Sequence, residues 1–175
     1  MNKIEICLCI NNVHNTKMAK SCGSKGHIFQ EAINHCRWKT VLRKNILTQP
    51  ELQEHNLHQF SGKSFDEILS FVYDKKVTGV GMLSIYDICA AICRYNKIPI
   101  KKIYIIGDGP KRAIRILNIK AKTHIIKNIK LKYIEIPELL KAFEEQHYAM
   151  DEHVKHSDSG DDFETYICNW QKIYA

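Results

Sequence analysis

The stretch Val77-Thr78-Gly79-Val80-Gly81 has residue types and spacing that suit phosphate binding. Glycine has no Cβ, so two glycines allow a tight turn and let another molecule approach the backbone closely. A helix that begins directly after such a turn presents unpaired N–H groups and the positive end of its dipole, and both favour an anion. The stretch therefore predicts a turn at which a phosphate group can bind.

Helical patterns on both sides of this stretch would position it. Before the turn, apolar residues follow the i, i+3, i+4, i+7 spacing of one helix face: Phe65, Ile68, Leu69 and Val72. Ser64 and Glu67 match a capping box, in which each side chain satisfies a backbone N–H at the start of the helix. After the turn the same spacing recurs at Ile85, Ile88, Cys89 and Ile92. The sequence thus predicts helix, tight turn, helix.

This arrangement resembles the helix-hairpin-helix motif, a family in which the hairpin holds the DNA backbone without reading sequence. The resemblance implies that Gly79, Val80 and Gly81 supply phosphate-facing amides, and Thr78 belongs to the same turn. A wider stretch, Lys63 to Cys168, is similar to a bacterial family of small helix-hairpin-helix proteins without assigned activity. The runs that carry this wider resemblance are SFDEI, GVGMLSIYD, IYIIGDG and FETYIC, and they imply no catalytic residue.

Cations near the turn and downstream of it would add phosphate contacts. Pro110 suits the first position of a helix, so Lys111, Arg112 and Arg115 are expected in the first turns of that helix. Cations there oppose the helix dipole by roughly 0.3–1 kcal/mol each. Two interpretations stay open: a docked anion offsets this cost, or the charges are tolerated at the surface because the cost is small and screened by salt. Four more lysines would supply affinity that salt weakens: Lys75, Lys76, Lys101 and Lys102.

Composition indicates a soluble, basic protein of the cytoplasm. The formal charge is +7 and the sequence pI is about 9.0, so the surface attracts polyanions. The N-terminal run MNKIEICLCINN lacks a long apolar core and a small-residue cleavage site, so we expect no signal peptide. No apolar run has the length needed to span a bilayer, and we expect no membrane contact. The seven cysteines are then expected to be reduced thiols.

We expect a mainly α fold with a minor β component, built around the helix-hairpin-helix unit. The expected strands are Lys3–Ile10, Ile103–Ile106 and Lys130–Ile136. The chain is expected to comprise an N-terminal region (1–62), a helix-hairpin-helix core (63–119) and a basic segment with C-terminal helices (120–175), together one globular domain. One face of the last helix would be apolar: Phe163, Tyr166, Ile167, Trp170 and Ile173 or Tyr174.

One enzymatic alternative is a DNA glycosylase. Asp108, in the context I-I-G-D, resembles the acid that those enzymes place downstream of a Gly-Val-Gly hairpin. The spacing from Gly81 is longer than in that family, and Met82 and Leu83 stand where a lyase lysine would be. Gly107-Asp108-Gly109 also partly resembles a dinucleotide-binding turn, but Arg112 occupies the third glycine position.

Two groups of residues have the ligand types of a metal site. The first is Cys7, Cys9, Cys22 and His27, whose spacing matches no zinc knuckle. The second is His147, Asp151, His153 and His156. Buried thiols and solvated histidines are the ordinary interpretation of both, so we expect no metal and no other cofactor.

The sequence therefore favours a binding protein over an enzyme. We expect non-sequence-specific binding to DNA, or to structured RNA, through the turn and its cations. The alternative from another class is a protein-interaction module of a larger complex, in which the glycines only form an interhelical turn and the C-terminal helix contacts the partner.

Overall fold

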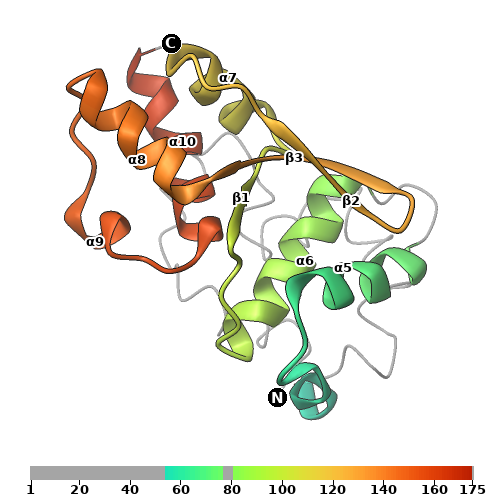
Figure 1. Cartoon of the computed structure of the whole chain (residues 1–175). Coiled ribbons are helices and arrows are strands. Elements are labelled where there is room, and N and C mark those ends of the chain that lie inside the picture. Colours follow the sequence, from blue (N-terminus) through green and yellow to red (C-terminus); the bar gives the residue numbers. More distant parts are fainter. Residues whose placement is uncertain (1–53, 77–80, 175) are drawn as a thin grey trace. The chain divides into compact units, whose positions relative to one another are not determined.

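The computed structural model describes residues 54–76 and 81–174 (Figure 1). The chain divides into two compact units, Met1–Ile98 and Pro99–Ala175. This boundary falls inside the expected core segment 63–119, so the end of that segment belongs to the second unit. The expected strand Lys3–Ile10 lies outside the described residues.

Two helices of the first unit bury the faces that their spacing predicted. Helices α5 (Phe65–Asp74) and α6 (Met82–Tyr95) pack against each other. The buried residues include every position of the two predicted faces: Phe65, Ile68, Leu69, Val72, Ile85, Ile88, Cys89 and Ile92. The 3-10 helix η4 (Glu54–Phe60) joins them, since Asn96 Nδ2 donates a hydrogen bond to the Leu57 carbonyl over 3.1 Å.

The predicted capping box at the start of α5 is confirmed. The Glu67 backbone N–H donates to Ser64 Oγ over 3.3 Å, and the Ser64 N–H donates to Glu67 Oε2 over 2.8 Å. Two hydrogen bonds from Ser64 lower the pKa of the Glu67 carboxyl. The bond from the Ser64 backbone has the larger effect, and the bond from its side chain has the smaller one. The two side chains thus satisfy backbone donors that the first turn leaves unpaired.

Replacing Ser64 with alanine should lower the free energy of unfolding by about 1 kcal/mol, because α5 loses its N-cap acceptor. Urea denaturation followed by circular dichroism measures the change. Ser61→Ala is the matched control, since Ser61 is exposed and precedes the helix. An equal loss in both variants would contradict a stabilising role for the capping box.

The second unit contains a three-stranded antiparallel sheet in the order β1–β3–β2 (Figure 1). Strands β2 (Lys122–Ile126) and β3 (Ile129–Glu135) form a hairpin, and β1 (Lys102–Tyr104) pairs with the other side of β3. Lys127, in the two-residue turn, has a φ of 53°, the positive value that such hairpin turns require.

This sheet makes the fold mixed α/β, and the expectation of a mainly α fold is wrong. Strand β3 was expected from the alternation after Ile129, but β2 was not. The adjacent apolar residues Ile125 and Ile126 break the alternation of β2, although they lie on opposite faces of the strand. Strand β1 is shorter than the expected Ile103–Ile106.

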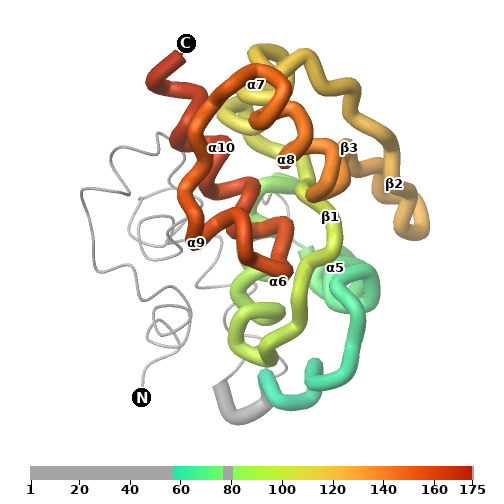
Figure 2. Tube along the Cα trace, turned by 60° about the vertical axis from the view of Figure 1, so that its left-hand side comes forward, coloured from blue at the N-terminus to red at the C-terminus, as the bar shows by residue number. Residues whose placement is uncertain are grey.

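Four helices complete the second unit: α7 (Asp108–Ile116), α8 (Ile136–Glu145), α9 (Glu152–Lys155) and α10 (Gly160–Tyr174). Helix α10 packs against α7 and β1, and it lies beside α7 in both Figures 1 and 2. The core of the unit includes Ile103 and Ile134 from the sheet together with side chains from α7, α8 and α10. These helices therefore cover the sheet face that carries Ile103 and Ile134.

The apolar face predicted for α10 is confirmed only as far as Trp170. Phe163, Ile167 and Trp170 are buried, and Tyr166 is partly buried against the same core. Ile173 is 77% exposed and Tyr174 is also exposed, so the last turn of α10 does not bury the predicted face.

Candidate nucleic-acid interface

Gly81 is the described residue of the predicted phosphate-binding turn, since Thr78, Gly79 and Val80 lie outside the described residues. It is the N-cap of α6, in extended conformation with φ −86° and ψ 169°. A positive φ is therefore not the reason for glycine at this position. Gly81 is exposed, and a Cβ added there would meet nothing within 4 Å, so the backbone around it is accessible.

The start of α6 has no side-chain cap and no acidic residue in its first turn. The starts of α5 and α8 are different, because a capping box satisfies backbone donors in each. The first N–H groups of a helix have no acceptor within the helix, and the dipole adds a partial positive charge there. The geometry at Gly81 thus suits an anion.

Lys75 and Lys76 follow α5 directly, on the side of the turn. Lys75 Nζ lies 5.5 Å from the centroid of the Phe71 ring, and Lys76 Nζ lies 3.8 Å from that of Tyr73. A cation over an aromatic face keeps its charge while its side chain is held in place. These contacts order two positive charges at the C-terminal end of α5.

Helix α7 starts earlier than its sequence indicated, with Gly107 as its N-cap and Asp108 as its first residue. Pro110 is therefore the third helical residue, and Arg115 lies in the last turn. The expectation that Arg115 opposes the helix dipole is wrong, because a cation in the last turn is favourable there. Lys111 pairs with Asp108 over 3.2 Å, while Arg112 and Arg115 are exposed.

Lys101, which precedes β1, and Lys102, the first residue of β1, differ in their surroundings. Lys101 is exposed. Lys102 is half-buried, with its Nζ 4.9 Å from the centroid of the Tyr133 ring and 3.3 Å from His124 Nδ1. Tyr104 Oη lies 2.9 Å from the same His124 nitrogen. Lys102 is therefore part of a cluster of side chains on one sheet face.

The sequence suggested that the predicted phosphate-binding residues belong to one compact unit. The structure divides them between two units. The turn, Lys75 and Lys76 are in the first unit, and the predicted cations from Lys101 to Arg115 are in the second. Each group is therefore a separate candidate contact.

Asp108, the candidate glycosylase acid, has the surroundings of a surface residue. Its side chain is 84% exposed, and its carboxylate pairs with Lys111 one turn along α7. Catalytic carboxyls are usually activated by burial or by a charged neighbour within a cleft. The geometry of Asp108 thus gives no support to that alternative.

The candidate metal ligands Cys7, Cys9, Cys22 and His27 lie outside the described residues. Within residues 54–76 and 81–174, no group of three or more His, Cys, Asp or Glu side chains has the geometry to hold a metal ion. This includes the second predicted group, from His147 to His156. Cys89, Cys93 and Cys168 are buried, and burial raises the pKa of the Cys89 thiol well above its usual value.

Comparison of the chain with protein families, with curated proteins and with solved structures gave no match. In the part of the chain that the structure describes, no helix is both long enough and apolar enough to cross a membrane.

Proposed function

We propose that this protein binds nucleic acid, chiefly DNA, without sequence specificity, and that the turn between α5 and α6 grips the phosphate backbone. The observation that carries the proposal is the accessible start of α6 at Gly81, where no side chain caps the helix. The ordered charges of Lys75 and Lys76 support it, because they flank the same turn. The net charge of +7 favours association with any polyanion.

Substitutions at Gly81 separate DNA binding from folding. Aspartate is among the best N-cap residues, so Gly81→Asp should keep or slightly raise the stability of α6. Its carboxylate would occupy the amides that a phosphate needs and would repel that phosphate. Gly81→Asn is the matched control, because it caps the helix equally well without the charge.

We expect Gly81→Asp to raise the Kd for a short labelled duplex on the order of tenfold, and Gly81→Asn to have a clearly smaller effect. Fluorescence anisotropy between about 50 and 200 mM salt measures both the Kd and its salt dependence.

In the same assay, Lys75→Glu/Lys76→Glu should weaken binding and reduce the slope of log Kd against log salt by roughly two, about 0.9 for each lost phosphate contact.

The control for the double lysine variant reverses the same charges beyond the opposite ends of the two helices. Lys63 precedes α5 and Lys97 follows α6, and both are exposed. Lys63→Glu/Lys97→Glu should change the Kd less than Lys75→Glu/Lys76→Glu does. Wild-type affinity in Gly81→Asp, with the fold intact, would show that the turn does not hold phosphate.

A protein-interaction module is the second candidate function, and the surface of the second unit favours it. A cavity of about 420 Å³ is lined by Leu140, Phe143, Glu144, Tyr148, Met150 and Lys155. Exposed Ile173 and Tyr174 end the neighbouring helix α10, where Tyr174 packs on Tyr148 with a centroid distance of 4.8 Å. A partner held on such apolar surface would bind with little salt dependence, unlike DNA.

A further inference from the structure

Charge is strongly segregated along the second unit. From Lys101 to Lys132 the sequence has ten Lys or Arg residues and a single acid, Asp108. From Tyr133 to Ala175 it has three Lys or Arg residues and ten acids. The net charge of the unit is therefore small, but its first half is strongly basic. Such a distribution attracts a polyanion to one part of a molecule.

The β2–β3 hairpin presents part of this charge on one exposed face. Thr123 pairs with Lys132 across the two strands, and Ile125 pairs with Lys130. All four side chains point to the same face because residues alternate along a strand, and all four are exposed. They lie on the face that carries Ile134, which the helices cover only near β1. The hairpin thus extends beyond the helices of its own unit, as Figure 1 shows.

The cations of this surface have few acidic partners. Among the described residues of this segment, Lys111 pairs with Asp108 and Lys122 pairs with Glu138. Within the same described ranges, no acidic group pairs with Arg112, Arg115, Lys120, Lys130 or Lys132. Lys132 Nζ donates instead to Thr123 Oγ1 over 2.8 Å, which fixes its position while leaving its charge uncompensated. These cations are available to an external anion.

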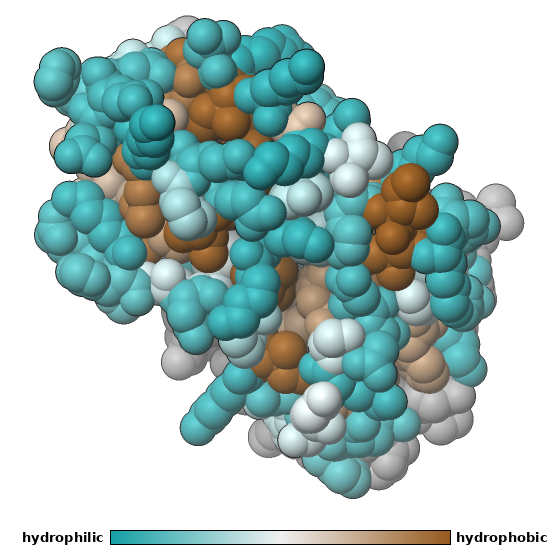
Figure 3. All heavy atoms as spheres, in the orientation of Figure 1, coloured by the Kyte–Doolittle hydropathy of each residue, from teal (hydrophilic) through white to brown (hydrophobic). Residues whose placement is uncertain are grey.

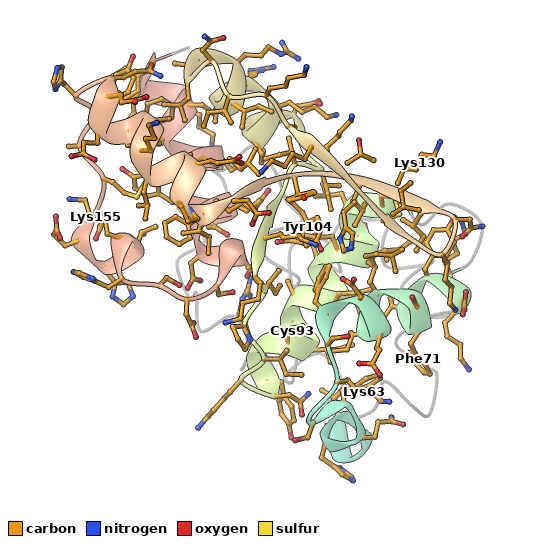
Figure 4. The ribbon with its side chains drawn as sticks, in the orientation of Figure 1. Lys63, Phe71, Cys93, Tyr104, Lys130 and Lys155 are labelled. Carbon is orange, nitrogen blue, oxygen red and sulfur yellow. The ribbon has the colours of Figure 1, made fainter. Side chains whose placement is uncertain are left out.

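An apolar side chain lies among these cations. Ile125 is 59% exposed, directly across from Lys130, and Figure 3 shows apolar surface over the hairpin with hydrophilic side chains on both sides. In Figure 4, Lys130 projects outward from the hairpin. Lys130 and Lys132 are two residues apart on β3, which places their Cα atoms roughly 7 Å apart along the strand.

We propose that the β2–β3 hairpin is a second nucleic-acid contact, which enters the major groove of duplex DNA. A two-stranded ribbon fits that groove, which is about 12 Å wide. Lys130 and Lys132 contact phosphates along the groove, and Ile125 contacts the apolar thymine methyl groups or sugar edges. The major groove of A-form duplex RNA is too narrow for a ribbon, so this surface favours DNA. The proposal does not depend on the turn between α5 and α6.

The first test neutralises the two lysines in the full-length protein. Lys130→Gln/Lys132→Gln should weaken binding to a short DNA duplex on the order of tenfold and reduce the slope of log Kd against log salt by roughly two. The matched control is Lys141→Gln/Lys172→Gln, which removes two exposed lysines from α8 and α10 of the same unit. This control should leave both quantities unchanged. Equal effects in the two variants would overturn the proposal.

The second test separates insertion into a groove from attraction by charge alone. Ile125→Ser should raise the Kd for duplex DNA several-fold without changing the salt slope, because it removes no charge. Ile173→Ser, at the exposed isoleucine of α10, should have no effect. Neither substitution should alter binding to duplex RNA. Unchanged DNA binding in Ile125→Ser, or an equal loss on duplex RNA, would exclude insertion into the major groove.

The hairpin and the turn can fail independently. If Gly81→Asp has no effect while Lys130→Gln/Lys132→Gln and Ile125→Ser weaken DNA binding, then the hairpin contact stands and the turn does not. The opposite pattern retains the turn and rejects the hairpin. If an acidic protein surface rather than DNA depends on Lys130 and Lys132, the nucleic-acid assignment of the hairpin is wrong.

Discussion

Replacing Gly160 with alanine should destabilise the second unit by about 3 kcal/mol, a large effect for one methyl group. Gly160 is the first residue of α10, and its N–H donates a 2.6 Å hydrogen bond to the Ile100 carbonyl. A Cβ there would lie 2.9 Å from the Ile103 nitrogen, 2.5 Å from the Lys102 carbonyl carbon and closer still to its oxygen. These atoms belong to the backbone that leads into and forms β1, so no side-chain rotation can make room.

The expected consequence is a displacement of α10 from β1. Because α10 supplies Phe163, Ile167 and Trp170 to the core, the strain would weaken the packing that holds the sheet to its helices. Chemical denaturation of Gly160→Ala against wild type measures the loss. A change below about 0.5 kcal/mol, the usual range of surface substitutions, would mean that α10 does not approach β1 this closely.

Gly81→Ala is the matched control for this glycine. It makes the same chemical change at a helix start where a Cβ meets nothing within 4 Å. Alanine is a poorer N-cap than glycine, so this variant should cost no more than about 1 kcal/mol. The stability loss of Gly160→Ala minus that of Gly81→Ala therefore measures the cost of the steric clash, without the cost of replacing glycine by alanine at a helix start.

The elements of the first unit that were predicted from sequence depend on local interactions. The buried faces of α5 and α6 follow from the spacing of Phe65–Val72 and Ile85–Ile92, and the capping box joins residues three apart. Such patterns lie within one or two turns of the chain, so the sequence reveals them. The start of α6 at Gly81 is predictable for the same reason.

Strands β1 and β3 were approximately predicted, but β2 and the pairing of the three strands into a sheet were not, because these pairings are not local. Strand β1 has three residues, and Lys102 pairs with Glu135 on β3, far along the chain. No local periodicity indicates such a partner, and a three-residue strand has almost no period to detect. In β2 the pair Ile125-Ile126 resembles a short apolar run, although only Ile126 is buried. The two-residue turn contains Lys127 and no glycine, although a glycine usually marks such a hairpin in the sequence.

The candidate site shows the same limit. The cations of Lys130 and Lys132 were visible in the sequence, but their common face with Ile125 follows only from the pairing of β2 with β3. Arg115 was placed in the wrong turn because α7 begins two residues before Pro110. The division of the predicted site between two units depends on tertiary contacts, which helix spacing does not report.

Replacing Gly109 with alanine should cost about 2 kcal/mol through a clash between α7 and α10. An added Cβ would lie 2.5 Å from Cys168 Sγ and 3.3 Å from the Cα and carbonyl oxygen of the same residue. The sulfur makes the shortest of these contacts, and Cys168 is buried. Cys168→Ala alone should cost about 1 kcal/mol for the lost buried atom. In the double variant, the new methyl group would occupy the space that the sulfur leaves.

The double-mutant cycle should therefore give a stabilising coupling of roughly 1–2 kcal/mol, with Gly109→Ala/Cys168→Ala more stable than Gly109→Ala alone. Cys168→Ser should rescue Gly109→Ala less well, because serine keeps a γ atom near the added methyl group and buries a hydroxyl. Urea unfolding of the set measures the coupling. Additive losses would show that backbone contacts set the separation of α7 and α10. A rescue of Gly109→Ala by Cys168→Ala, and not by Cys168→Ser, would show that the sulfur sets the separation of α7 and α10. Packing beneath α7 would then also determine where Arg112 and Arg115 lie on the basic surface.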